Sequence, residues 1–248
     1  MSLSINADDF GRDGTTNDAV ARAWSERLID SASLMAPATA FREAAVMAKD
    51  LGIRTGVHVT LTCEKGYGLK YPPLTDHACL RGRQFPDSMV EFREWITADR
   101  DVLVDEVDAQ FGAVTDAGLD PQFFDSHVFS IPGRIMERLW LVEYIANKYS
   151  IPFVDAMRNG SRVTSVPTIV GVKFPVGRTL AERAESISRI LHNVRVHWLA
   201  LHLNGENPRD PSRRIEFDAL NQEEVRRSIN ARRRRDGDAS RLVHTSDV

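Results

Sequence analysis

Two adjacent carboxylates, Asp8 and Asp9, stand at the end of a short apolar run and directly before the sequence Phe-Gly. Two like charges side by side repel each other, and burying either one without a cation or a hydrogen-bond donor is costly. A strand that ends in this pair therefore predicts a metal ion that neutralises one carboxylate while the other moves protons. The imidazoles that could join them are His58 and His127, each placed near the end of another apolar run.

One carboxylate and two imidazoles form a ligand set that suits Zn²⁺, Fe²⁺, Mn²⁺ or Co²⁺ and leaves positions open for water and substrate. If Asp9 binds the metal, Asp8 would be the general base toward metal-bound water, because a turn after the strand lets both side chains point the same way. His202 could then donate a proton to the leaving group. Together these residues predict metal-assisted hydrolysis of an amide or an ester.

Each of these residues also has a simpler interpretation that the sequence leaves open. Adjacent aspartates before a glycine often cap a helix or form a turn, and Asp125-Ser126-His127 could do the same. His58 could be a hydrogen-bonded core histidine. The basic run from Arg232 to Arg235 is interpreted as a solvated helix face.

The composition sets broad limits on the class of protein. The chain has 248 residues, is 42% hydrophobic and carries a net charge of −3. This length fits a single α/β barrel, so one catalytic domain over residues 1–248 is expected, and the charge gives no case for a nucleic-acid or membrane partner. No apolar stretch approaches the roughly 18 residues of a membrane span. With only Cys63 and Cys79 and no signal-like N-terminus, a cytoplasmic location is expected; the oligomeric state, a homodimer included, is left open.

Short apolar runs alternate with longer stretches of helical spacing, which is typical of repeated βα units. Strands are predicted at residues 3–7, 32–35, 54–61, 122–125, 153–154 and 196–201, with residues 168–174 either a strand or an excursion. Helices are predicted at 16–26, 41–51, 99–117, 134–148, 180–191 and 221–235. The candidate polar residues fall at the C-terminal ends of the strands, where the loops of a parallel barrel converge on an active site.

Three motifs recur in the same order in a known family: NADDFG at residues 6–11, GVHVTLT at 56–62 and DSH at 125–127. On these motifs the sequence resembles the YdjC-like carbohydrate deacetylases, the family that includes chitooligosaccharide deacetylase. The resemblance spans nearly the whole chain. It implies a TIM-like (β/α) barrel related to NodB-type polysaccharide deacetylases, with fewer than eight regular strands.

The resemblance also implies an activity, which is removal of an acetyl group from an N-acetylated amino sugar or oligosaccharide. The implied metal ligands are Asp9, His58 and His127, with Asp8 as general base. His202 would be the general acid or would orient the acetyl group. One divalent ion is implied, with Mg²⁺ or Zn²⁺ favoured and Mn²⁺ or Co²⁺ as alternatives.

Two departures from the family pattern bear on the substrate. Val128 follows His127 where many members carry further histidines, and Leu203 follows His202 where many members have proline. Candidate substrate contacts are Tyr67 and Tyr71, in a long stretch without periodicity, and Asp125. Alternative functions are a metal-dependent esterase or phosphoryl hydrolase with the same site, or a non-catalytic sugar-binding barrel.

Overall fold

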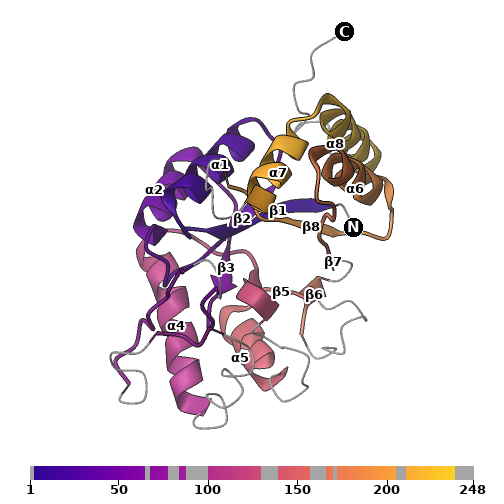
Figure 1. The fold of residues 1–248 in the computed structure, drawn as a ribbon. Helices are drawn as coiled ribbons and strands as arrows, with labels where there is room; N and C mark the ends of the chain where they lie inside the picture. The colour runs from indigo at the N-terminus through magenta and orange to yellow at the C-terminus, as the bar shows by residue number, and fades with distance from the viewer. Residues whose placement is uncertain are drawn as a thin grey trace.

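Eight strands pair side by side in parallel and form one sheet that curves into a nearly closed barrel (Figure 1). The computed structural model describes residues 3–64, 68–77, 84–87, 100–129, 139–156, 166–169, 172–204 and 211–237. The order across the sheet is β6-β5-β4-β3-β2-β1-β8-β7. The strands are β1 (Ser4–Phe10), β2 (Ser31–Leu34), β3 (Thr55–Val59), β4 (Phe124–Ser126), β5 (Phe153–Val154), β6 (Thr168–Ile169), β7 (Val172–Lys173) and β8 (Trp198–Leu201).

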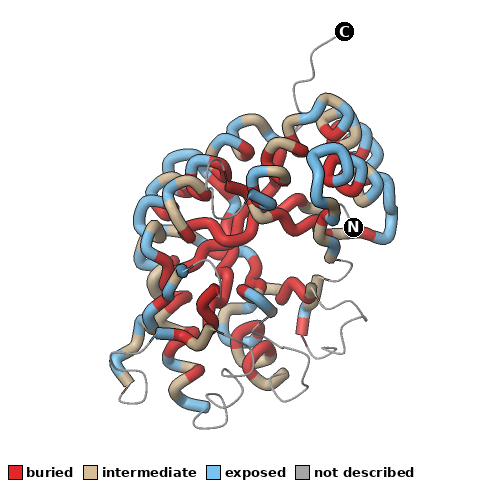
Figure 2. Tube along the Cα trace, in the orientation of Figure 1, coloured by how far each residue is buried: buried red, intermediate tan, exposed pale blue. Residues whose placement is uncertain are grey.

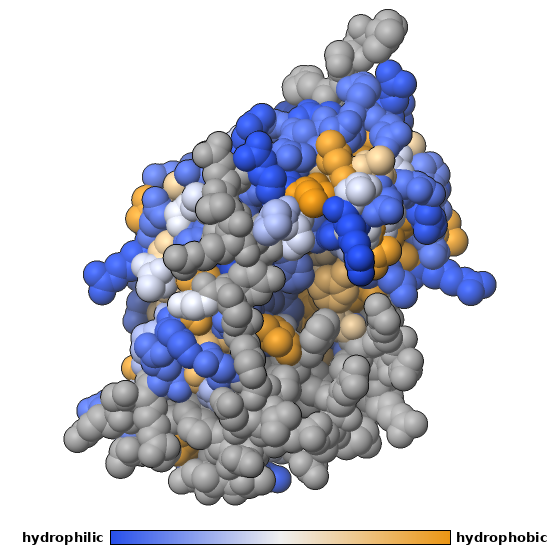
Figure 3. All heavy atoms as spheres, viewed as in Figure 1, coloured by the Kyte–Doolittle hydropathy of each residue, from blue (hydrophilic) through white to orange (hydrophobic). Residues whose placement is uncertain are grey.

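Helices lie around the outside of this sheet (Figure 1). α1 packs on α2, and α6 packs on both α7 and α8. Within the part of the chain that is described, no helix combines the length and apolar character needed to cross a lipid bilayer. On the face drawn in Figure 3, hydrophilic side chains cover most of the described outer surface. The helices are α1 (Gly14–Ser25), α2 (Phe41–Leu51), α4 (Arg100–Asp116), α5 (Leu139–Tyr149), α6 (Leu180–His192), α7 (Pro211–Leu220) and α8 (Glu223–Asp236).

Side chains alternate along each strand, so one face of the sheet packs on the helices and the other lines the barrel interior. On β1, Ile5 and Ala7 belong to the main hydrophobic core, as do Leu199 and Leu201 on β8. The buried positions in Figure 2 accordingly follow the strands and the inner sides of the helices.

The barrel interior has an apolar half and a polar half. A separate apolar cluster is built around four buried residues near β4, β5 and β8, with partly buried neighbours from β6, β7 and the chain after β7: Phe123, Val154, Trp198, Ala200, Ile169, Val172 and Phe174. The alternate positions of β1, β2, β3 and β4 are instead polar and buried: Asn6, Asp8, Ser31, Ser33, His58 and Asp125. The halves meet at Gly56, where an added Cβ would lie 2.3 Å from the Phe123 ring.

The predicted parallel barrel is confirmed, and so are the bounds of the helix at 41–51 and of the strand at 153–154. Fewer than eight regular strands were expected, whereas the sheet has eight, of which β5, β6 and β7 span two residues each. Residues 168–174 contain two short strands, β6 and β7. The final helix, predicted at 221–235, is α8. The preceding helix, α7, was not predicted from the sequence, and it carries residues of the site described below.

The prediction that Arg232 to Arg235 form a solvated helix face is wrong for two of the four arginines. The Arg232 guanidinium donates to the backbone carbonyls of Asn193 and Val196, at 2.8 and 3.1 Å. The Arg233 guanidinium donates to the Asp30 carboxylate at 2.6 Å. Both arginines are buried, because they fasten α8 to the end of the barrel opposite the strand C-termini.

Candidate functional site

β1 ends in a bulge that directs both aspartates into the same region. The register with β2 shifts between Ala7 and Phe10, and Asp9 has φ of +63°, a left-handed conformation that is uncommon outside glycine. In a regular strand Asp8 and Asp9 would point to opposite faces. The bulge removes that conflict, and both carboxylates are buried at the C-terminal end of the strand.

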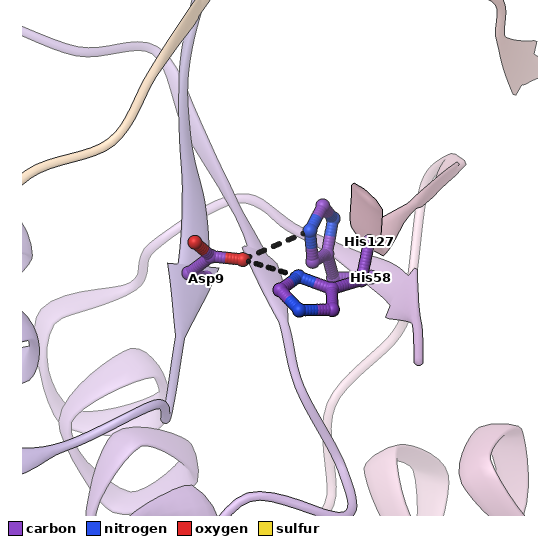
Figure 4. A group of neighbouring side chains, drawn as sticks. All are labelled: Asp9, His58 and His127. Atoms are coloured by element: carbon purple, nitrogen blue, oxygen red, sulfur yellow. Dashed lines mark hydrogen bonds and ion pairs between the residues drawn. The ribbon is translucent and has the colours of Figure 1, made fainter. Parts of the chain in front are cut away.

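Asp9, His58 and His127 meet at this end of the barrel (Figure 4). Asp9 Oδ1 lies 3.0 Å from His58 Nε2 and 3.0 Å from His127 Nδ1. His58 comes from β3, and His127 begins the short 3₁₀ helix η1 (His127–Phe129) directly after β4. One ligand atom from each residue lies within 4.8 Å of the others, so this buried group could hold a metal ion.

His58 is held from behind by a carboxylate. Its Nδ1 lies 2.7 Å from Asp125 Oδ1, and the Ser33 hydroxyl donates to Asp125 Oδ2 at 2.9 Å. Burial lowers the pKa of His58, but Asp125 outweighs it, so the pKa lies well above the usual value. A carboxylate on the far nitrogen fixes the tautomer and the ring orientation of a metal-binding histidine, and it leaves Nε2 for Asp9 and a cation.

Asp8 sits beside the trio in a different environment. The Asn6 side-chain amide donates to Asp8 Oδ1 at 2.7 Å and to the Ser33 hydroxyl at 3.2 Å, while the Ser31 hydroxyl donates to Asn6 Oδ1. Burial, and then the nearby charge of Asp125, raise the pKa of Asp8 well above its usual value. A carboxylate with a raised pKa accepts a proton more readily than an exposed aspartate, which is what a general base requires.

His202 lies on the other side of Asp8, at the end of β8. Its Nε2 is 3.8 Å from Asp8 Oδ2, and its ring stacks on Phe174 with centroids 6.0 Å apart. Its backbone N–H donates to Glu216 on α7 at 2.6 Å. Partial burial and the positive charge of Arg213 lower the pKa of His202 to about 4, so the imidazole is neutral at neutral pH.

Four residues next to the trio have contacts that the sequence did not predict: Arg12, Glu64, Tyr71 and Arg213. The Arg12 guanidinium donates to both oxygens of Glu64 at 2.8 Å, and the Tyr71 hydroxyl donates to Glu64 Oε1 at 2.8 Å. Arg213 Nη1 lies 2.6 Å from Asp9 Oδ2, and its Nη2 lies 3.6 Å from Glu64 Oε2. Burial would raise the pKa of Asp9, but Arg213 and His127 outweigh it and hold the pKa well below the usual value.

The donor atoms fit a divalent cation. Two ligand atoms that share one ion at about 2.1 Å lie about 3.0–3.4 Å apart, which matches the two distances from Asp9 Oδ1 to the histidine nitrogens. On the other side of the ring, His127 Nε2 lies 3.9 Å from Glu64 Oε1. Four buried carboxylates and two buried arginines gather around the trio: Asp8, Asp9, Glu64, Asp125, Arg12 and Arg213.

The candidate substrate residues have separate outcomes. Tyr71 is only 1% exposed and its ring packs edge-on against His127. Its burial does not favour stacking on a sugar, and its role as a substrate contact stays a prediction. Asp125 is engaged by His58 and Ser33. Tyr67 lies outside the described residues. Asp8 and His202 lie together beside the trio as predicted, and their roles stay predictions.

Comparison with known proteins shows the family of the chain. The family model described as YdjC-like protein matches residues 2–231. The chain belongs to the YdjC-like family. A carbohydrate deacetylase from Geobacillus stearothermophilus is 33% identical over 69% of this chain and 65% of its own length. One from Brevibacillus brevis is 32% identical over 61% of this chain and 58% of its own length. The alignments therefore span less than two thirds of these YdjC-like relatives.

Two solved structures share the fold. A putative cellobiose-phosphate cleavage protein from Enterococcus faecalis V583 superposes with a TM-score of 0.72 at 22% identity, covering 93% of this chain and 94% of the other. A peptidoglycan N-acetylglucosamine deacetylase superposes with a TM-score of 0.52 at 12% identity, covering 99% and 89%. At these identities the likeness concerns the barrel of the YdjC-like chain alone.

Proposed function

We propose that this YdjC-like protein is a metal-dependent hydrolase that removes an acetyl group from an N-acetylated amino sugar or oligosaccharide. The observation that carries the proposal is the buried trio of Asp9, His58 and His127 beside a second carboxylate, Asp8, that the trio does not use. The carbohydrate deacetylases to which the chain is similar point to the same reaction.

Each residue has a defined task in this proposal. Asp9, His58 and His127 would hold a divalent cation, which would polarise the acetyl carbonyl and acidify water. Asp8, with its raised pKa, would accept the proton of the attacking water. His202 is neutral at rest and lies 3.8 Å from Asp8. It would therefore pass on a proton gained during the reaction to the departing amine, rather than supply one that it carries beforehand.

The finer assignments are part of the same proposal. The ligand set contains two imidazole nitrogens, which suit Zn²⁺, and one carboxylate, whereas Mg²⁺ prefers oxygen ligands throughout. Reconstitution with Zn²⁺, Mg²⁺, Mn²⁺ and Co²⁺ in turn would identify the ion. The small number of cysteines in the sequence supports a cytoplasmic location, which cell fractionation would test. Sedimentation analysis would decide between a monomer and a homodimer.

The activity can be tested with metal-stripped protein reconstituted with each ion in turn. We expect acetate release from N,N′-diacetylchitobiose, and we expect Asp9→Ala and His58→Ala to lose both the ion and the activity. Folded, metal-loaded protein that cleaves an acetyl ester but no N-acetyl sugar would replace the proposal with an esterase. Sugar binding without any acetate release would replace it with a binding protein.

A further inference from the structure

Among the described residues, Arg213 brings a positive charge into direct contact with a candidate metal ligand. It lies on α7, in a part of the chain far from β1, and its side chain is 10% exposed, against 1% for Asp9 and 5% for Glu64. Its Nη1 is 2.6 Å from Asp9 Oδ2. Bringing a guanidinium into a buried site costs free energy unless it is paired, so this placement calls for a functional reason.

The position of Arg213 is fixed from two sides. Glu64 lies 3.6 Å from its second nitrogen, and Glu64 is itself held by two hydrogen bonds from Arg12 and one from Tyr71. One turn further along α7, Glu216 accepts the backbone N–H of His202. α7 is therefore anchored at the site by two neighbouring positions, and the guanidinium has little freedom to leave Asp9.

The two oxygens of Asp9 are divided between different partners. Oδ1 faces the nitrogens of His58 and His127 at 3.0 Å each, whereas Oδ2 faces Arg213. A carboxylate that shares its charge with a guanidinium donates less of it to a cation on its other oxygen, because like charges on its two sides repel.

We propose that Arg213 is a positioning residue of the metal site. By pairing with Asp9 Oδ2, Arg213 leaves Oδ1 to the cation and reduces the negative charge that this carboxylate donates to the cation. The inference rests on the proposed metal-dependent function. Arg213 then weakens metal binding and strengthens the polarising power that the reaction needs. If Arg213 only held the fold together, replacing it would lower both the metal affinity and the turnover, or would change neither.

The test separates metal affinity from turnover. Zn²⁺ affinity of metal-stripped protein is measured by titration calorimetry, and kcat and KM for N,N′-diacetylchitobiose are measured on the Zn²⁺-loaded protein. The variants are Arg213→Gln, Arg213→Lys and the matched control Arg214→Gln. Arg214 is the next residue on the same helix, its side chain is 50% exposed, and it pairs with Asp218 in the same helix.

For Arg213→Gln we expect Zn²⁺ to bind about tenfold more tightly, because one positive charge beside the ion is gone, and kcat to fall about tenfold or more. Arg213→Lys keeps the charge but cannot reach both Asp9 and Glu64, so its affinity should stay within about threefold of wild type while kcat falls. Arg214→Gln should match wild type in both measurements.

Three results would overturn the inference while leaving the proposed function intact. The first is a folded Arg213→Gln that binds Zn²⁺ more weakly than wild type, and the second is a folded Arg213→Gln with unchanged Zn²⁺ affinity and unchanged kcat. The third applies if Arg213→Gln does not fold, and it is an Arg213→Lys that loses tenfold in Zn²⁺ affinity or keeps the wild-type kcat. Wild-type protein that binds none of Zn²⁺, Co²⁺, Mn²⁺ or Mg²⁺ would instead overturn the metal-dependent function itself, and this inference with it.

Discussion

The polar and apolar halves of the barrel interior share the same strand geometry, but one orients the charged side chains of the site and the other provides apolar packing. In the polar half, Asn6, Ser31 and Ser33 form hydrogen bonds that lead to Asp8 and to Asp125. In the apolar half, Phe123 packs on Trp198 with ring centroids 4.8 Å apart. Buried polar groups contribute little net stability and are expensive to leave unpaired, whereas apolar burial is the main source of stability.

The difference indicates how the molecule can keep a reactive site in a folded barrel. Hydrogen bonds orient Asp8 and His58 in the polar half, whereas the apolar half supplies the packing that these bonds do not. Stability and metal binding should therefore respond to substitutions in different halves. Three substitutions test this separation, and a fourth tests the start of α1 beside the site.

The largest effect on stability should come from the apolar half, at Trp198, which is buried at the centre of its cluster. Trp198→Ala should lower the free energy of unfolding by about 3–5 kcal/mol, since it leaves a large cavity, and should leave Zn²⁺ affinity unchanged in the folded protein. Urea unfolding and calorimetry measure the two quantities. Trp24→Ala, at a half-buried position on α1, is the control and should cost less. A loss of Zn²⁺ affinity in folded Trp198→Ala would show that the halves are not separable.

The junction between the halves is Gly56, whose missing Cβ makes room for the Phe123 ring. Gly56→Ala should cost about 1–3 kcal/mol of unfolding free energy, because the ring or the strand must move. The matched control is Gly112→Ala in α4, where an added Cβ meets nothing within 4 Å and where alanine favours the helix by up to about 1 kcal/mol. Equal thermal stability of the two variants would refute the close contact.

In the polar half, Asp125→Asn should act on metal binding rather than on packing. It removes the charge that orients His58, and loss of such a partner typically weakens metal affinity about 10–100-fold. The exposed Asp116→Asn controls for the loss of one negative charge. If calorimetry gave wild-type Zn²⁺ affinity for Asp125→Asn, then Asp125 would not support the ligand set.

The smallest effect on stability should come from Asp13, the N-cap of α1, which lies just after the bulge in β1. Asp13 caps this helix by accepting the backbone N–H of Thr16 at 2.8 Å. Burial would raise the pKa of Asp13, but this hydrogen bond, the hydroxyls of Thr15 and Thr16 and the charge of Arg12 together outweigh it, so the pKa is lowered. Asp13→Ala should cost about 1 kcal/mol at neutral pH, and urea unfolding at several pH values measures it.

The stability that Asp13 contributes depends on pH, and the lowered pKa of Asp13 sets the direction of this dependence. Because the folded pKa is lower than the unfolded one, the charged form of Asp13 contributes fully above an unfolded pKa of about 3.9, and the contribution is lost as pH falls through the folded pKa. Asp13→Asn keeps a capping oxygen but cannot titrate, so its stability difference from wild type should be constant near neutral pH and shrink in acid. A difference that grew in acid would contradict the lowered pKa.

Much of the fold, and the trio that could hold a metal ion, could be predicted from local patterns. Apolar runs that end in a charged residue identified β1 and β3, and the alternation around His58 placed its side chain on the face opposite Val57 and Val59. The bulge at Asp9 was predicted only as a turn that would have to follow the strand. Its left-handed conformation depends on the contacts that both carboxylates find in the folded barrel.

The surrounding charges could not be predicted in the same way. Arg12 reads as part of a glycine-containing loop, and Glu64 begins a stretch without periodicity, yet the two pair across 52 residues. Arg213 lies on α7, a helix of 10 residues that begins at a proline and was not predicted. Pairings over such separations are set by how the barrel closes, which no local pattern encodes.

The central claim is that the trio holds a cation while Asp8 moves the proton, and Asp8→Asn tests it most directly. Zn²⁺ content and acetate release from N,N′-diacetylchitobiose should be measured on the same reconstituted samples of wild type, Asp8→Asn and the exposed Asp18→Asn. We expect all three to bind one ion per chain, with acetate release lost by about 10²–10⁴-fold in Asp8→Asn alone. An Asp8→Asn protein that binds the ion and still releases acetate at the wild-type rate would contradict the claim.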